Sequence, residues 1–333
     1  MRRAVGRPTQ DGHDDFADTH AVVLGGAGFL GSHLTDELVA SGAVVTVVDN
    51  HITSDGLRNL THLVGHPRLR YLRQDICDGI DLRRAGGPAG VDYIVNMASP
   101  ASPVDYLEHP IATLRAGSQG THNALDLAAR TGATMLQAST SEVYGDPLVS
   151  PQPETYLGNV SSIGPRSVYD EAKRFSEAIV MSFHREYGVD IRLPRIFNTF
   201  GPRMRLRDGR AVPAFFQAAL NGQPLPVHGD GSQTRSLCYV SDLVEGLLRL
   251  LVSDYVGPVN IGNPHEVTVL DLARRVQATV GRHPGVEFLP RPTDDPSRRC
   301  PDTSVAEREL SWQATVPLDE GLVATAAYFA QAR

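Results

Sequence analysis

The run GGAGFLG at residues 25–31 is the feature that most constrains how this chain can fold. It directly follows the apolar run AVVL and stands where a helix is predicted to begin, near Phe29. In such a turn Gly25, Gly28 and Gly31 let the backbone and the helix N-terminus approach a pyrophosphate group. We therefore expect a strand–turn–helix unit that binds a dinucleotide through these glycines and the adjoining Phe29 and Leu30.

An acidic residue ends the next predicted strand, AVVTVVD. Asp49 lies 18 residues after Gly31, where a carboxylate accepts hydrogen bonds from the adenosine ribose hydroxyls. The same charge repels a 2′-phosphate, so NAD is expected rather than NADP. Asn50 is expected beside the ribose, and Asp75 and Ile76 at the adenine edge, with an ordinary strand terminus as the alternative for this last pair.

Short apolar runs alternate with helical segments through the first half of the chain. The expected strands start near residues 21, 43, 69, 91, 133 and 189, and helices near Phe29, Ile111 and Ser167. Runs that are apolar on both faces belong to parallel sheets covered by helices, which predicts an α/β, Rossmann-type doubly wound fold. After about residue 198, Gly- and Pro-containing loops separate short helices and predict a smaller second domain.

Composition and charge exclude several other classes of protein. The formal net charge of −7 disfavours a nucleic-acid surface, and no run reaches the roughly 18 apolar residues of a membrane helix. The first residues contain no apolar signal segment, and the three cysteines show neither disulfide nor metal spacing. We expect a cytoplasmic protein that holds no metal and binds neither nucleic acid nor membrane.

Tyr169 and Lys173 stand four residues apart in VYDEAKR, so on a helix they share one face. A nearby ammonium favours the phenolate form of a tyrosine, which normally titrates near pH 10. This pair predicts a general base that takes the proton of an alcohol while the alcohol carbon is oxidised. A surface pair on an amphipathic helix is the alternative.

A polar run follows the strand near residue 133, at the sheet edge where open α/β sheets bind ligands. It begins with Thr140, Ser141 and Glu142. Thr140 is expected to donate to the oxygen that Tyr169 deprotonates, and the next two side chains to face the neighbouring carbon. A polar turn with a solvated Glu142 is the alternative.

Several longer motifs resemble a known family. GGAGFLGSH, STSEVYGD, YDEAKR, RIFNTFGPRM and SQTRSLCYVSD together resemble the extended short-chain dehydrogenase/reductases that act on nucleotide sugars, the NAD-dependent epimerase/dehydratase family. Within it, ASPASP, GPRSVYDEAKR and DDPSRRCPD are most similar to the UDP-glucuronic acid decarboxylases. The resemblance implies a lyase that uses NAD and a UDP-sugar, oxidising C4 of UDP-glucuronic acid, releasing CO2 from C5 and re-reducing C4 to give UDP-xylose.

The change in sequence texture also sets the expected domains. We expect a flexible tail over residues 1–19, an NAD-binding Rossmann domain over 20–198 and a smaller nucleotide-sugar-binding domain over 199–333, interleaved with the first. The resemblance further implies substrate contacts. Arg299 is the expected catalytic cation for the sugar carboxylate, with Arg298 as its competitor. The remaining expected substrate contacts are Tyr106, Asn198, Arg210 and Arg235. A homodimer paired through helices near 111–130 and 168–187 is expected on the same basis.

Related chemistries remain open at this stage. A nucleotide-sugar 4-epimerase or 4,6-dehydratase begins with the same oxidation, but such dehydratases carry Asp where this chain has Ser141. An NAD-sensing regulatory protein is a further alternative, but it would not need Thr140, Glu142, Tyr169 and Lys173 together. Two departures from the decarboxylase pattern, Gly117 for the usual Asn and Ala172 for the usual Gly, suggest that some 4-keto pentose is released before re-reduction.

Overall fold

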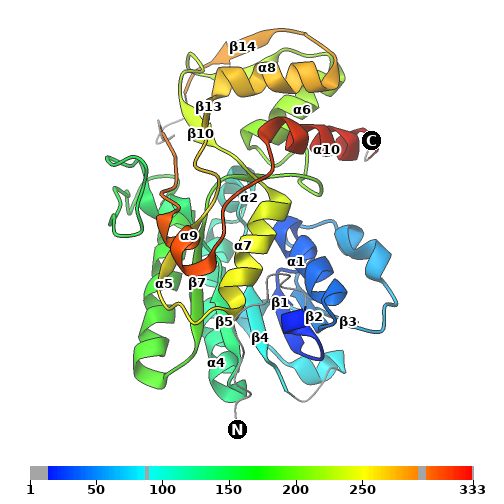
Figure 1. Ribbon diagram of the computed structural model, residues 1–333, viewed down its shortest axis with the longest axis vertical. Helices are drawn as coiled ribbons and strands as arrows, with labels where there is room; N and C mark the ends of the chain where they lie inside the picture. The colour runs from blue at the N-terminus through cyan, green and yellow to red at the C-terminus, as the bar shows by residue number, and fades with distance from the viewer. Residues whose placement is uncertain (1–13, 87–89, 292–297, 332–333) are drawn as a thin grey trace.

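The computed structural model describes residues 14–86, 90–291 and 298–331 (Figure 1). Residues 292–297, with the start of the DDPSRRCPD motif, and most of the expected N-terminal tail lie outside this range. Within it, Phe16 belongs to the short turn η1 (Asp14–Phe16), is 1% exposed and packs edge-on against Tyr93. Phe16 therefore belongs to the core.

A parallel sheet forms the body of the molecule. Its strands run in the order β12-β7-β5-β4-β1-β2-β3, and the short β6 also pairs with β7. Their bounds are β1 His20–Leu24, β2 Val44–Asp49, β3 Leu69–Arg73, β4 Tyr93–Asn96, β5 Thr134–Gln137, β6 Ser139–Thr140, β7 Ile191–Ile196 and β12 Pro258–Ile261. The strand order reverses between β1 and β4, which places the ligand crevice of such a sheet there.

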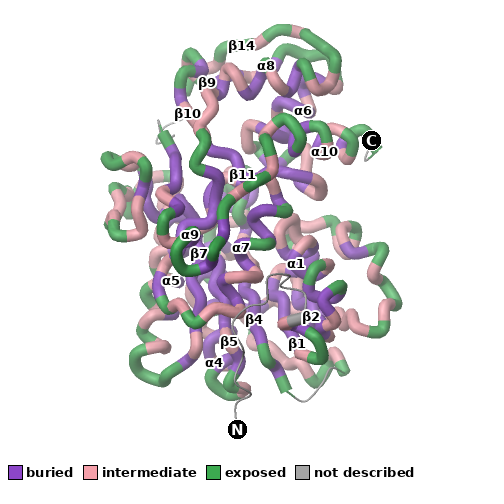
Figure 2. The backbone as a smooth tube through the Cα atoms, in the orientation of Figure 1, coloured by how far each residue is buried: buried purple, intermediate pink, exposed green. Residues whose placement is uncertain are grey.

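Helices cover both faces of this sheet, which explains why its strands are apolar throughout. On one face α1 (Phe29–Ala40) and α7 (Val240–Val252) pack against residues such as Val23; on the other, α4 (Thr121–Thr131) and α5 (Ser167–Tyr187) pack against residues such as Val22. Figure 2 shows the strands buried beneath these helices. The α/β Rossmann-type prediction and the predicted strand positions are confirmed.

A second lobe lies beyond the carboxyl edge of the sheet (Figure 1). It has its own apolar core, which includes Phe216, Leu272 and Phe329. Its elements are α6 Ala211–Asn221, β9 Leu225–His228, β10 Thr234–Ser236, β13 Glu266–Thr268, α8 Val269–Val280, β14 Val286–Leu289 and α10 Leu318–Gln331. Because β12 and α7 return to the main sheet after earlier elements of the second lobe, the chain passes between the two lobes more than once.

Shorter elements connect these parts. They are η2 Arg58–Leu63, η3 Ile76–Asp78, η4 Leu82–Ala85, α2 Pro103–Glu108, α3 Pro110–Arg115, the π-helical turn η5 Ala116–Gly120, η6 Ser141–Tyr144, β8 Thr199–Phe200, β11 Cys238–Tyr239 and α9 Ser304–Leu310. Among the described residues, no helix is both long and apolar enough to cross a membrane.

Candidate active site

A cavity of about 1120 Å³ opens at the carboxyl edge of the sheet and extends beneath the second lobe. All the residues predicted for cofactor, substrate and catalysis line it. The structure thus brings together, in one space, side chains that are up to 274 positions apart in the chain, from Gly25 to Arg299. Arg298 is not among the lining residues.

The glycine turn is packed closely enough that side chains would not fit. Gly25 has a φ of +76°, and a Cβ there would lie 2.8 Å from the Ala98 backbone. A Cβ on Gly31 would collide with the carbonyl oxygen of Gly25. Helix α1 begins at Phe29, so its N-terminus is directed at the cavity beside this bare backbone, as pyrophosphate binding requires.

Acidic side chains mark the adenosine end of the cavity. Asp49 ends β2 and accepts hydrogen bonds from the backbone N–H groups of Ala27, at 3.0 Å, and His51, at 2.8 Å. Asp75 accepts from the Asn50 amide at 3.0 Å. These contacts fix two carboxylates at the strand ends, and the set fits the adenosine half of NAD.

Tyr169 and Lys173 both lie on the buried face of α5. The Tyr169 ring stacks on Tyr106 with 5.2 Å between ring centroids, and the Lys173 Nζ lies 5.7 Å from the Tyr169 centroid. Burial, and then Glu142, raise the pKa of Tyr169, whereas a hydrogen bond with Thr140 opposes the rise. In this structure Tyr169 is therefore a phenol that hydrogen-bonds with Thr140.

The ammonium of Lys173 is fixed by a hydrogen bond to the backbone. It donates to the Ala138 carbonyl at 2.9 Å. Burial lowers the pKa of Lys173 to about 8, and the carboxylate of Glu177, one turn along α5, acts against this. Lys173 is thus charged at neutral pH but close to its titration range.

Glu142 is clamped between two arginines. Arg166 donates from Nη2 to its Oε2 at 2.5 Å, and Arg299 donates from Nη1 to its Oε1. Burial alone would raise the pKa of Glu142, but Arg299 and Arg166 outweigh it and lower the pKa to about 2. The cluster of Arg166, Glu142 and Arg299, here called the arginine clamp, therefore carries a net positive charge.

Arg298 and Arg299, which lie between β14 and α9, have different surroundings. Arg299 is 3% exposed and faces the cavity, whereas Arg298 pairs with Glu266 on the outside, at 2.5 Å. Sequence reasoning left the choice between them open, and of the two only Arg299 lines the cavity. It did not single out Arg166, although that residue stands in the quoted GPRSVYDEAKR motif.

Arginines of the segment after β8 line the cavity. Arg210 pairs with Asp208 at 2.7 Å, and Arg203 pairs with Asp36 at 2.5 Å. Asn198 and Arg235 line the same cavity. The sequence predicted Asn198, Arg210 and Arg235, but not the acidic partners, since those pairings depend on how the loops meet.

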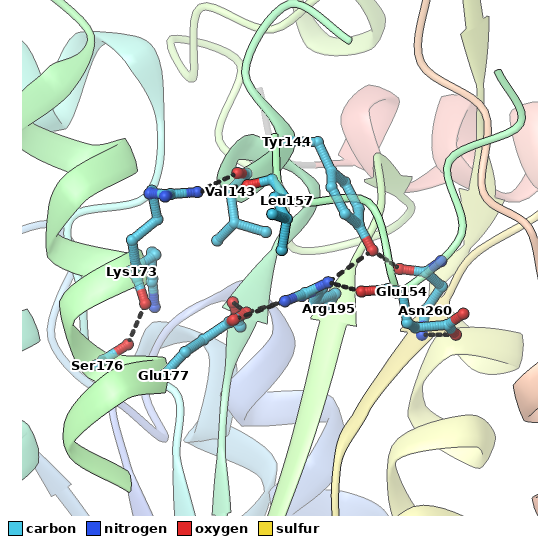
Figure 3. A network of polar contacts seen from close by, with 11 residues as sticks. Val143, Tyr144, Glu154, Leu157, Lys173, Ser176, Glu177, Arg195 and Asn260 are labelled. Carbon is cyan, nitrogen blue, oxygen red and sulfur yellow. Dashed lines mark hydrogen bonds and ion pairs between the residues drawn. The ribbon is translucent and has the colours of Figure 1, made fainter. Parts of the chain in front are cut away.

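A network of polar side chains connects helix α5 with the neighbouring strands of the sheet (Figure 3). Arg195 on β7 pairs with Glu177 at 2.8 Å and donates to the Tyr144 hydroxyl at 3.0 Å. Ser139, on β6, donates to Glu177 at 2.5 Å, and Tyr144 donates to Asn260 on β12 at 2.7 Å. The network therefore ties α5 to β6, β7 and β12.

Comparisons with known proteins agree with this site. UDP-glucuronic acid decarboxylase 1 of Arabidopsis thaliana is 50% identical over 90% of this chain and 67% of its own length. UDP-glucuronic acid decarboxylase 1 of Danio rerio is 48% identical over 93% of this chain and 72% of its own.

A solved structure shows the same fold with ligands bound. It is a tyrosine-to-phenylalanine mutant of UDP-glucuronic acid 4-epimerase from Bacillus cereus, in complex with UDP-4-deoxy-4-fluoro-glucuronic acid and NAD. It matches with a TM-score of 0.82 and 26% identity, over 95% of this chain and all of that one. Residues 21–262 also match the model of a family whose members depend on NAD. The chain belongs to the NAD-dependent epimerase/dehydratase family.

Proposed function

We propose that this chain converts UDP-glucuronic acid to UDP-xylose, using NAD that is regenerated in each turnover. The observation that carries the proposal is the arginine clamp, which gives the cavity net positive charge beside the tyrosine base. A sugar with a carboxylate at C5 complements that charge. The similarity to UDP-glucuronic acid decarboxylases supports the same substrate.

The first step removes hydrogen from C4 of the sugar. Tyr169 takes the C4 hydroxyl proton, and Thr140 hydrogen-bonds to the same oxygen. Burial raises the pKa of Tyr169, so the charge of Lys173, 5.7 Å from its ring centroid, and the charge of bound NAD would have to offset that rise. NAD, held by the glycine turn and Asp49, supplies the acceptor and later the donor of the C4 hydride. The chain's own contribution is to place the C4 oxygen within reach of Tyr169 and away from water.

Loss of CO2 follows from the chemistry of the oxidised sugar. A ketone at C4 makes the C5 carboxylate part of a β-keto acid, so the C5–carboxylate bond breaks and its electron pair becomes an enolate on O4. Thr140 and Tyr169 are placed to donate to that oxygen. Ser141 adds a hydroxyl near C5 without a further negative charge, as a carboxylate substrate requires.

The diphosphate and nucleoside are assigned to Arg210, Arg235 and Asn198. All three line the cavity, and arginine's planar fork suits phosphate oxygens. UDP and dTDP sugars share this diphosphate, so competition between UDP and dTDP for the NAD-loaded enzyme is the measurement that distinguishes them.

The direct test is to incubate the NAD-loaded protein with UDP-glucuronic acid and measure CO2 release, with product analysis by NMR. We expect CO2 and UDP-xylose, together with some released UDP-4-keto-pentose. Conversion of UDP-glucose or dTDP-glucose with no CO2 from UDP-glucuronic acid would instead support the 4-epimerase or 4,6-dehydratase alternatives. Binding of NAD with no turnover of any of these sugars would support a regulatory protein.

We also propose a cytoplasmic homodimer. Leu107 on α2, Ile111 on α3 and Phe175 on α5 are 55%, 68% and 49% exposed. Elements α2, α3 and α5 pack against one another, and a second copy would cover these exposed apolar side chains. Cys77, Cys238 and Cys300 are free cysteines in the described part of the chain.

A further inference from the structure

The two arginines of the clamp differ in how many donors they have left. Arg299 is 3% exposed; its Nη1 donates to Glu142, its Nη2 donates to the Gly145 carbonyl at 2.9 Å, and its Nε is buried with no hydrogen-bond partner. The Arg166 side chain is 21% exposed and lines the cavity. Within the described part of the chain, its one hydrogen-bond partner is Glu142, through Nη2.

From this difference we infer that Arg166 is the guanidinium that binds the substrate carboxylate, while Arg299 holds Glu142 in place. The inference rests on the proposed function and assigns its key contact to a residue outside the predicted site. A carboxylate is bound best by two parallel N–H groups of one guanidinium. Arg166 has such groups available toward the cavity, whereas both Nη atoms of Arg299 are already committed to protein oxygens.

The position of Arg166 in the chain supports this assignment. It is the N-cap residue of α5, three residues before Tyr169, so one turn of a single helix carries both the base and the cation. Tyr169 acts at the C4 oxygen, and the carboxylate is attached to the adjacent carbon, C5. Rigid attachment to one helix end sets the spacing between these two contacts, whereas Arg299 comes from a loop 157 residues away from Glu142 in sequence.

The charges around Arg166 also agree with it. Glu142 is shared with Arg299, so it neutralises only part of the Arg166 charge. Asp170, the other acid near this guanidinium, is 6% exposed and has an Oδ1 with no hydrogen-bond partner. Burial and then Glu142 raise the pKa of Asp170 to about 7, so near neutral pH Asp170 competes weakly for Arg166. Positive charge is left for an incoming anion.

The test compares binding of UDP-glucuronic acid and UDP-glucose, which differ at C5 by the carboxylate. NAD-loaded Tyr169→Phe protein serves as the parent because it binds without turnover, and titration calorimetry measures Kd. Adding Arg166→Gln is expected to weaken the binding of UDP-glucuronic acid by roughly tenfold to a hundredfold and to leave the Kd of UDP-glucose unchanged. Arg166→Lys should recover part of the loss, because it restores charge without the fork.

Arg298→Gln is the matched control, since it removes a neighbouring arginine that is also paired with a glutamate but lies outside the cavity. It is expected to change the Kd of neither sugar. An equal loss of affinity for both sugars in Arg166→Gln, or no loss of affinity for either, would overturn the inference. Wild-type protein assayed in parallel separates the two claims: no CO2 release would overturn the proposed function, and with it the inference. CO2 release with unchanged Arg166→Gln binding would overturn the inference alone.

Discussion

Replacing Gly117 with alanine is expected to slow turnover by displacing the catalytic helix. Gly117 lies in the π-helical turn η5 and packs against α5 at Ala172, which stands between Tyr169 and Lys173. A Cβ at residue 117 would lie 2.7 Å from the Ala172 carbonyl oxygen and 2.8 Å from its Cβ. Both distances fall well below the 3.4 Å at which ordinary contact begins, so α5 must move by several tenths of an ångström.

The magnitude follows from two opposing effects. Overpacking costs about 1–3 kcal/mol, while alanine regains about 1 kcal/mol of helix propensity over glycine, so a net destabilisation of up to ~2 kcal/mol is expected. Activity is more sensitive, because a misplacement of about 1 Å at a reacting group costs on the order of a hundredfold in rate. We therefore expect kcat for CO2 release to fall by roughly tenfold or more.

A double-mutant cycle distinguishes this contact from a general loss of stability. Ala172→Gly removes the Cβ contact but leaves the carbonyl, so it should restore part of the activity lost in Gly117→Ala. Gly90→Ala, where an added Cβ meets open space, is the control and should be silent in both kcat and melting temperature. Wild-type kcat in Gly117→Ala, or no coupling between residues 117 and 172, would refute the steric reasoning.

Three further variants test the site and the assembly. Glu177→Gln removes the carboxylate that raises the pKa of Lys173, so that pKa should fall below about 8 and the alkaline limb of the pH–rate profile should move to lower pH. The control Glu186→Gln, at an exposed residue of the same helix, should leave the limb in place. An unmoved limb in Glu177→Gln would contradict the assignment of this limb to Lys173. Tyr169→Phe should abolish NAD reduction and CO2 release together, measured by absorbance and CO2 trapping, and decarboxylation at the wild-type rate would exclude oxidation as the first step. Ile111→Glu places a charge on the exposed apolar face and should convert a dimer to a monomer in light scattering, and an unchanged mass would place the interface elsewhere.

The parts of the site that the sequence predicted are those set by local structure. The glycine turn and Asp49 depend on one strand–turn–helix unit, and the Tyr169–Lys173 pair depends on the periodicity of one helix. The clamp of Arg166 and Arg299 on Glu142 could not be predicted in this way. Its members come from three separate segments, and which arginine faces the cavity depends on how the second lobe returns to the first.

Departures from the family pattern also needed the structure for their interpretation. In sequence, Gly117 and Ala172 are separate departures from the decarboxylase pattern, and they suggest release of some 4-keto pentose. In the structure the two residues are in contact, and this backbone has no room for a side chain at 117. The pair is thus a coupled packing change beside the catalytic helix, and any release of 4-keto pentose would depend on both positions.

The division of the active site between earlier and later segments of the chain explains how one oxidation can lead to different products. The segments up to Lys173 place the general base, the lysine and the cofactor turn, and these groups only have to oxidise C4. What happens at C5 depends on the charge beside it, and Arg299, which fixes the orientation of Glu142, comes from beyond β14. Without Arg299, Glu142 would compete with the substrate for Arg166. Arg299→Gln should therefore weaken carboxylate binding even though Arg299 does not touch the substrate, and an additive effect of Arg166→Gln and Arg299→Gln on Kd would contradict this indirect role.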